Sequence, residues 1–251
     1  MVSVQQVYDT LKDLANKDQK GFITPAVFNN FAGVAQINIY NELFQELVKA
    51  KQIQRQNFDP GRDKSVRKQA TEDLSVFIVS DFKISGSSGL FLKPTNLSKI
   101  ISISSTDDDR LEIEYASSTS SYNRKQVELV YDAEKIDRIL TSNLSTPTAD
   151  FPVALISDEI EVFPSGIDKI RVTYYRRPGS IDINGDANNA QPTYASVMLM
   201  GSEQFNPNSS LNFMLPPHYT TELVMEMAKL IGVRLRDPNL AGFAAQEEAS
   251  E

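Results

Sequence analysis

Cysteine and tryptophan are absent from this chain of 251 residues, and histidine occurs once, as His218. Without cysteine, the chain has no disulfide, no zinc–thiolate site and no cysteine nucleophile. A Ser/His/Asp arrangement would depend on His218 alone, and this residue follows two prolines at a predicted helix start, where we expect a structural or capping role. The phosphate-binding patterns GxxxxGKS/T and GxGxxG do not occur. We therefore expect a protein that is not an enzyme and that needs no cofactor.

Long hydrophobic runs are absent as well. The longest one is Val76–Val79, and no stretch of eighteen apolar residues or charged-then-apolar N-terminus occurs. We therefore expect neither a membrane span nor a secretory signal, and no membrane partner. With 41% hydrophobic residues, the chain can bury the core of one large domain or two small ones.

Basic residues are outnumbered, 25 against 33 acidic ones, and the formal net charge is −8. This balance argues against affinity for nucleic acid through the surface as a whole. It is compatible with a protein that DNA passes, because a negative wall keeps DNA from adhering. The many carboxylates also offer pairs for glycoside hydrolysis, but the sequence singles none out.

One acidic segment has the composition of a calcium loop. Asp182, Asn184 and Asp186 place oxygen ligands at alternate positions, as an EF-hand loop begins. However, Gly185 comes one place early, and the twelfth position holds Thr193 instead of glutamate. The spacing therefore favours a plain Asx/Gly turn, and we expect no metal site.

The longest periodic stretch, residues 24–55, predicts one long amphipathic helix. Thr24 is a preferred N-cap, and Pro25 suits the first helical position. One buried face is indicated by the three- and four-residue spacing of Val27, Phe31, Val34, Ala35, Ile39, Leu43, Leu47 and Val48. Such a helix would be ~45 Å long. Two interpretations follow: an ordinary core helix, or a helix that contacts its own domain on one side and a neighbouring subunit on the other.

Further helices are predicted on both sides of a β-rich centre. The periodicity of apolar residues predicts them over 3–17, 62–73, 132–144 and 217–236, with a last one from 238 onward. Strands are predicted over 75–79, 90–92, 99–103, 110–115, 153–156, 159–163 and 169–175. We expect the last three strands to form an antiparallel meander, because only short turns separate them.

These elements predict an α+β fold. Residues 1–74 and 213–251 are expected to form one helical layer, and residues 75–178 an inserted antiparallel β-rich domain that carries the helix near 132–144. Residues 179–212 are rich in Asn, Gly, Ser and Pro, with one apolar island at 197–200. We interpret this segment as an extended loop or a β-hairpin arm.

Two groups of residues are candidates for contacts with partners. Surplus apolar surface suggests a subunit interface at Ile37, Tyr40, Phe44, Val197, Met198, Leu199 and Met200. The densest basic cluster lies on the helix predicted at 62–73 and consists of Arg62, Lys64, Arg67 and Lys68. It is either a solvated helix face or a docking surface for an acidic partner or for phosphates.

Three blocks of the sequence carry a resemblance. The first is GFITPAVFNNFAGVAQINIYNELFQEL at 21–47, and the last is LPPHYTTELVMEMAKLIGVRLRDP at 215–238. The central block consists of Ile136–Leu140, Leu144, Pro147-Thr148, Phe151-Pro152, Ile160–Pro164 and Val172–Pro178. In this order, the blocks resemble virion structural proteins of crAss-like podoviruses that infect Bacteroidetes.

This resemblance implies a head-to-tail connector protein, also called an adaptor or ring protein. Such proteins form a homo-oligomeric ring below the portal, usually a dodecamer, and line the channel through which DNA leaves the head. The implied partners are the portal and other connector or tail proteins, and the implied location is the virion, assembled in the host cytoplasm. The alternative that the β-rich centre suggests is a tail module that binds carbohydrate or a receptor.

Overall fold

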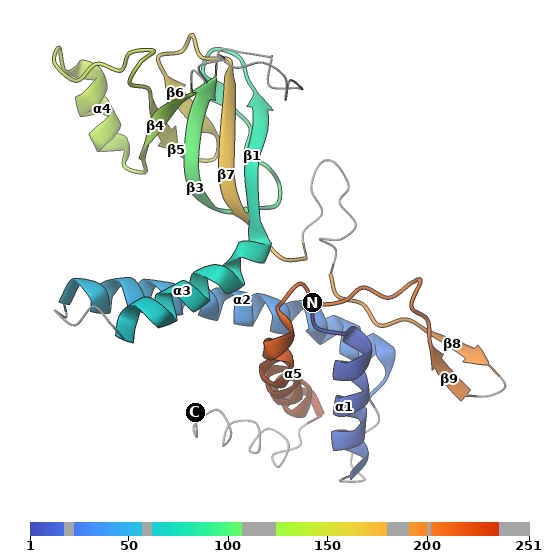
Figure 1. Cartoon of the computed structure of the whole chain (residues 1–251). Coiled ribbons are helices and arrows are strands. Elements are labelled where there is room, and N and C mark those ends of the chain that lie inside the picture. The colour runs from blue at the N-terminus through green and yellow to red at the C-terminus, as the bar shows by residue number, and fades with distance from the viewer. Residues whose placement is uncertain (18–22, 57–61, 107–123, 180–190, 200–201, 236–251) are drawn as a thin grey trace, which may run out of the picture. The chain divides into compact units, whose positions relative to one another are not determined.

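The computed structural model describes residues 1–17, 23–56, 62–106, 124–179, 191–199 and 202–235, without the side chains at 16–17, 50–56, 62–67, 106 and 233–235. These residues form helices and a large sheet, so the fold class is α+β (Figure 1). The chain divides into two compact units, which we describe separately. Unit 1 comprises Met1–Phe77 and Arg177–Glu251, and unit 2 comprises Ile78–Arg176.

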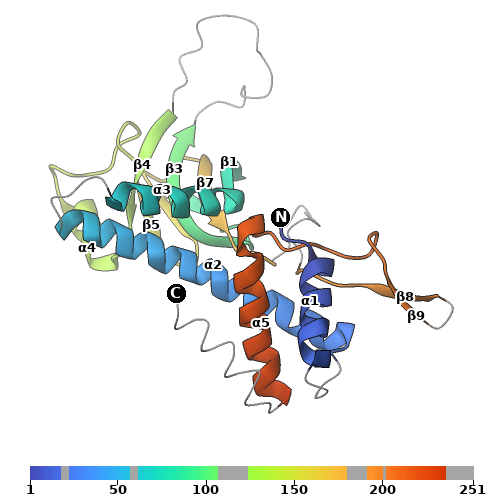
Figure 2. The same cartoon turned by 60° about the horizontal axis from the view of Figure 1, so that its bottom comes forward.

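Unit 1 is mainly helical. Helices α3 and α5 pack against α2, and α1 packs against α5 (Figures 1 and 2). Its elements are α1 (Val4–Lys17), α2 (Pro25–Gln56), α3 (Arg62–Leu74), the 3-10 turns η1 (Ser75–Phe77) and η3 (Pro217–Tyr219), and α5 (Thr220–Leu235). The helices predicted over 3–17, 24–55 and 62–73 are thereby confirmed within one residue. The helix predicted over 217–236 is confirmed over Thr220–Leu235, and residues 217–219 form the turn η3 before it. The helix predicted from 238 onward lies outside the described residues.

The start of α2 shows why the chain turns helical there. The Thr24 hydroxyl accepts a hydrogen bond from the backbone N–H of Val27 at 3.3 Å. This bond satisfies one of the four amide groups that a helix start leaves unpaired. The predicted buried face of α2 is only partly right, because Ile39, Leu43 and Leu47 are buried whereas Val34 and Val48 are about half exposed.

Unit 2 contains a seven-stranded sheet with the strand order β1-β7-β3-β4-β5-β6-β2. The strands are β1 (Ile78–Ser85), β2 (Leu90–Phe91), β3 (Leu97–Thr106), β4 (Arg124–Val130), β5 (Val153–Ile156), β6 (Ile160–Phe163) and β7 (Lys169–Arg176). Strands β4 and β5 pair in parallel. The sheet is therefore mixed, and the predicted all-antiparallel arrangement is wrong.

The predicted meander is also wrong in its last step. β5 and β6 do pair antiparallel, but β7 lies between β1 and β3. The burial of β7 agrees with this position, because the consecutive residues Ile170, Arg171 and Val172 are all buried. A strand that is covered on both faces suits the interior of a sheet better than the end of a meander.

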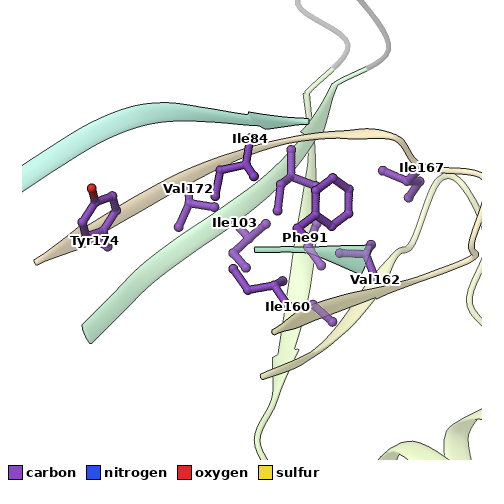
Figure 3. Close-up of a cluster of buried hydrophobic side chains, with 11 residues drawn as sticks. Ile84, Phe91, Ile103, Ile160, Val162, Ile167, Val172 and Tyr174 are labelled. Carbon is purple, nitrogen blue, oxygen red and sulfur yellow. The ribbon is translucent and has the colours of Figure 1, made fainter. Parts of the chain in front are cut away.

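The core of unit 2 lies on one face of this curved sheet (Figure 3). Alternate residues of β7, namely Ile170, Val172 and Tyr174, point into it, as expected from the two-residue period of a strand. They pack with Ile84, Phe91, Ile103, Val127, Ala154, Ile160, Val162 and Ile167. Burial of these side chains is the main favourable contribution to the stability of this unit.

Helix α4 (Ala133–Thr141) confirms most of the helix predicted over 132–144, but it ends at Thr141, three residues earlier than predicted. The Asp132 side chain caps it by accepting a hydrogen bond from the Glu134 N–H at 3.0 Å. Ile136 is buried against Val130 and Val153, and these three residues form a smaller second core.

Several strand boundaries differ from the prediction. The strand predicted over 75–79 begins only at Ile78 and continues to Ser85, because residues 75–77 form the turn η1. Strand β4 was not predicted, since Arg124-Lys125-Gln126 gives a weak strand signal. The strand predicted over 110–115 lies outside the described residues.

A substitution at Gly89, the residue before β2, tests the close packing of this segment against β6. Its φ is +79°, and a Cβ built on it would lie 2.4 Å from the Val162 carbonyl oxygen. We predict that Gly89→Ala lowers the free energy of unfolding by about 2 kcal/mol or more, through backbone strain and the clash. Gly166→Ala is the matched control, because its Cβ would meet nothing within 4 Å. Urea denaturation of both variants checks this, and equal stability would contradict it.

Candidate interaction surfaces

The arm predicted at 179–212 contains a two-stranded hairpin. β8 (Ser196–Leu199) pairs antiparallel with β9 (Ser202–Phe205), and residues 180–190 and 200–201 lie outside the described part. In both views the hairpin extends away from α1 and α5 (Figures 1 and 2). Within the described residues, the apolar island of this segment thus lies on a strand at the end of an arm.

Three candidate interface residues are exposed on β8. Val197 is 44% exposed, Met198 70% and Leu199 50%. The fourth residue of the group, Met200, lies outside the described residues. Because successive side chains of a strand point to opposite faces, Val197 and Leu199 lie on one face of the hairpin and Met198 on the other. Apolar side chains that are exposed on such a strand favour contact with another chain. We call Val197, Met198 and Leu199 the hairpin patch.

The chain just before the hairpin is fixed to α2 by two hydrogen bonds. The Tyr194 N–H donates to Asn29 Oδ1 at 2.7 Å, and the Asn29 amide donates back to the Tyr194 carbonyl at 3.0 Å. Thr193 and Leu211 also exchange two backbone hydrogen bonds, of 3.0 and 2.8 Å. The base of the arm therefore has a defined position within unit 1.

An aromatic cluster connects the same base to α1. Tyr194 stacks on Tyr8 with ring centroids 3.9 Å apart, and Phe28 and Phe205 lie against these rings. The Tyr8 hydroxyl donates to the Ile23 carbonyl at 3.1 Å. Burial raises the pKa of the Tyr8 phenol, and the Glu203 carboxylate raises it further, so Tyr8 remains a donor at neutral pH.

An ion pair adds to this connection. Lys12 of α1 lies 3.4 Å from a carboxylate oxygen of Glu203 on β9, and both side chains are partly buried. Together, the hydrogen bonds, the ring stacking and this pair join α1, α2 and the hairpin.

The remaining interface candidates lie on α2 and differ from the hairpin patch. Tyr40 and Phe44 are only 2% and 5% exposed, and their rings pack edge to face at 4.9 Å. Tyr40 also packs on Phe77 of η1 at 4.9 Å. The apolar surface that suggested a subunit contact is therefore covered by the chain itself at these two residues, whereas Ile37 is half-buried.

The predicted basic cluster lies on α3. The side chains of Arg62, Lys64 and Arg67 lie outside the described residues. Lys68 is exposed and forms an ion pair with Glu72 one helical turn later, at 3.6 Å. For Lys68, the solvated helix face is the interpretation that this contact favours.

Sequence reasoning did not find a groove in unit 1. It has a volume of about 790 Å³ and is lined by residues of α2, α3, η3 and α5. Five carboxylates line it, namely Glu42, Glu46, Asp73, Glu222 and Glu226, together with the cationic or ionisable side chains of Lys229 and His218. Only the three-dimensional packing brings these residues together, because they are spread over about 190 positions of the sequence. The groove is negatively charged and suits a cationic group of a partner.

A hydrogen-bonded cluster lies at one end of the groove. Asp73, which is largely buried, accepts a 2.9 Å hydrogen bond from the Tyr219 hydroxyl and lies 3.3 Å from Nε2 of His218. The neighbouring Thr220 hydroxyl donates to the Pro217 carbonyl at 2.6 Å and not to the imidazole. The cluster therefore joins α3 to the start of α5 and does not align this hydroxyl as a nucleophile. Burial raises the pKa of Tyr219, and its hydrogen bond to Asp73 raises it further.

The calcium-loop composition at 182–186 lies outside the described residues. Among the residues that the structure describes, no group of three or more His, Cys, Asp or Glu side chains has the geometry of a metal site. Within the same part of the chain, no helix is both long and apolar enough to span a membrane.

Comparisons with known proteins add no relatives. No family model matches the chain. No curated protein matches it either. The interpretation of the surfaces therefore rests on their geometry and chemistry.

The Asp73–Tyr219 hydrogen bond can be tested directly. We predict that Tyr219→Phe lowers the free energy of unfolding by about 1–3 kcal/mol, because it leaves a largely buried carboxylate with one donor fewer. Tyr131→Phe is the matched control, since Tyr131 is 65% exposed and its change is expected to stay within about 0.5 kcal/mol. Urea denaturation measures both, and similar effects of the two variants would contradict the prediction.

The acidic groove predicts a pH effect. Glu46 is exposed to solvent at the groove, but partial desolvation raises its pKa, and the carboxylates of Glu42 and Asp73 raise it against the lowering effect of Lys49. Solvent screening keeps the effect small. An ionised Glu46 is thus less favourable in the folded than in the unfolded state, and this penalty is fully present at neutral pH. We predict that Glu46→Gln stabilises the protein at pH 7 and that the gain disappears below the ordinary pKa of 4.5.

The measurement is the urea midpoint of wild type and variant at several pH values. Glu159→Gln, in an exposed turn, removes the same charge elsewhere and serves as control. A Glu46→Gln variant that is less stable than wild type at pH 7 would show that the carboxylate is favourable there.

Proposed function

We propose that this protein is a non-enzymatic virion structural protein, a subunit of a homo-oligomeric ring in the head-to-tail connector of a crAss-like tailed phage. In this proposal the ring lies below the portal and lines the channel through which DNA leaves. Residues 1–74 and 213–251 form its helical layer, residues 75–178 a β-rich insertion and residues 179–212 an arm. The resemblance of the three sequence blocks motivates this assignment.

The observation that carries the proposal is the hairpin patch. Val197, Met198 and Leu199 are 44–70% exposed, yet the base of their hairpin is fixed to α1 and α2. A fixed arm with an apolar tip is a disadvantage for an isolated chain, because the exposed tip promotes non-specific association with other molecules. In a ring, the same arm buries its tip on the next subunit.

The acidic groove supports the proposal as a second and different surface. A ring closes through head-to-tail contacts, so each subunit needs two distinct interfaces. The hairpin patch is apolar, whereas the groove between α2, α3 and α5 carries a row of carboxylates. The two surfaces are therefore distinct. The groove suits a cationic group of a partner and is not the complement of the apolar hairpin patch.

The net charge of −8 supports a protein that lines the path of DNA without binding the DNA tightly. Carboxylates repel the phosphate backbone at short range, and salt screens this repulsion beyond about 10 Å. A wall with excess negative charge thus lets DNA move past without being held. Specific contacts with bases are not part of the proposal.

The hairpin patch gives the test. We predict that the triple variant Val197→Ser, Met198→Ser, Leu199→Ser abolishes or strongly weakens ring formation, alone or with the portal, because it removes the apolar contact and leaves the base of the arm intact. The control is Val34→Ser with Val48→Ser, two residues of α2 with exposures of 44% and 47%. Negative-stain electron microscopy and native mass measurement report the assembly state.

Thermal denaturation of the unassembled triple variant should match that of wild type, since exposed residues contribute little to the folded subunit. A wild-type protein that stays monomeric and does not bind portal would contradict the proposed function. Rings that form equally well with the triple variant would refute the assigned role of the hairpin patch.

A further inference from the structure

Unit 2 contains a buried arginine, two of whose nitrogens have no hydrogen-bond partner among the residues that the structure describes. On β7, Ile170, Val172 and Tyr174 point into the core, so Arg171 lies on the opposite face of the sheet. It is 7% exposed, and its Nε and Nη2 atoms are buried without a hydrogen-bond partner. Buried polar groups are almost always paired, and an unpaired one destabilises the fold.

The two unpaired nitrogens belong to the same edge of the guanidinium. Nε and Nη2 direct parallel N–H groups to one side, and this geometry matches two oxygens of a phosphate or carboxylate. A backbone carbonyl satisfies only one of the two donors well. The unpaired edge therefore has the form of half of a bidentate oxyanion contact.

The residues around Arg171 are polar or cationic. Lys83 of β1 lies directly opposite it on one side, and Ser104 of β3 on the other. Residues directly opposite in an antiparallel pair share a face of the sheet. Thr173, two residues further along β7, lies on this face as well. We call Lys83, Arg171, Ser104 and Thr173 the cationic face.

An ion pair crosses this face. Arg124 of β4 holds both carboxylate oxygens of Asp81 on β1, each at 2.9 Å. β7 and β3 lie between β1 and β4, so the pair spans the two strands that carry Arg171 and Ser104. Asp81 lies at a bulge of β1 with φ +56°, and its N–H donates to the Thr173 hydroxyl at 3.3 Å. Bulges of this kind often adjust side chains at functional sites.

We propose that the cationic face binds a phosphate oxyanion. Two oxygens of the ligand accept the Nε–H and Nη2–H groups of Arg171, and Arg124 and Lys83 supply further positive charge. The hydroxyls of Ser104 and Thr173 are the neutral donors. The unpaired edge of Arg171 thus supplies the two donors that carry the site, and Arg124 adds a second guanidinium on the same face.

Nε and Nη2 of Arg171 are buried, so a ligand reaches them only after side chains on this face move. In our proposal the side chain that moves is Arg124, which then becomes a second ligand-binding residue. Its side chain is 35% exposed and that of Asp81 46%, so their pair is partly solvated. The bidentate geometry strengthens this pair, whereas its solvation lowers the cost of opening it.

The phosphate has two possible sources, a free anion or the backbone of a nucleic acid. The inference does not depend on ring assembly, because all residues that carry it belong to unit 2 of one chain. Binding of a backbone phosphate would give the proposed DNA channel a local contact. Binding of inorganic phosphate alone would indicate a small-anion site.

Calorimetric titration of the full chain with inorganic phosphate, and separately with a short oligodeoxynucleotide, tests the proposal at constant ionic strength. We expect saturable binding by wild type and at least ~10-fold weaker binding by Arg171→Lys, which keeps the charge but loses the Nε–H edge. Arg124→Gln should weaken binding similarly. The matched control is Arg138→Gln on α4, whose side chain pairs with Glu134 at 3.2 Å and is 79% exposed.

If Arg171→Lys fails to fold, Arg124→Gln and Ser104→Ala carry the comparison. Phosphate binding that these variants weaken supports the site with a free anion as its ligand, and oligonucleotide binding with the same pattern supports it with a backbone phosphate. The proposal is overturned if neither probe binds wild type, or if all variants bind as wild type does.

Discussion

The stacking of Tyr8 on Tyr194 is the contact on which the arrangement of unit 1 depends. It joins α1 to the chain segment that leads into the hairpin, and the two hydrogen bonds between Asn29 and Tyr194 tie α2 to the same point. A two-stranded hairpin alone is marginally stable in water at best. Held at its base by buried rings, β8–β9 presents Val197, Met198 and Leu199 in a defined direction instead of as part of a fluctuating loop.

The two units contain buried charged side chains that differ in their hydrogen-bond partners. In unit 1, the carboxylate of Asp73 is stabilised by the Tyr219 hydroxyl and by His218. In unit 2, one edge of the Arg171 guanidinium is buried without a partner. The first is a complete network that holds helices together. The second is incomplete, and violations of this kind are expected mainly at functional or strained sites.

The helices were predictable because their signals are local. The Thr24-Pro25 cap, the Asp132 cap and the apolar period of α5 need no knowledge of the rest of the chain. The sheet was harder, since strand neighbours are set by long-range packing: nothing local shows that Lys169–Arg176 lies between β1 and β3. Apolar composition suggested both Tyr40 and Met198 as interface residues. The structure shows that Tyr40 packs against Phe77 and is buried, whereas Met198 is exposed. The acidic groove and the position of Arg171 likewise arise from pairing between distant segments.

The most direct measurement of the central claim is photo-crosslinking from the hairpin. A photoreactive residue at Met198, 70% exposed, would be activated in assembled particles, with the same probe at Val34 as the reference position. The account predicts chain-to-chain adducts from position 198 that map to a different surface of the neighbouring subunit. Particles that assemble but give no chain-to-chain adduct from position 198, while position 34 does, would contradict it.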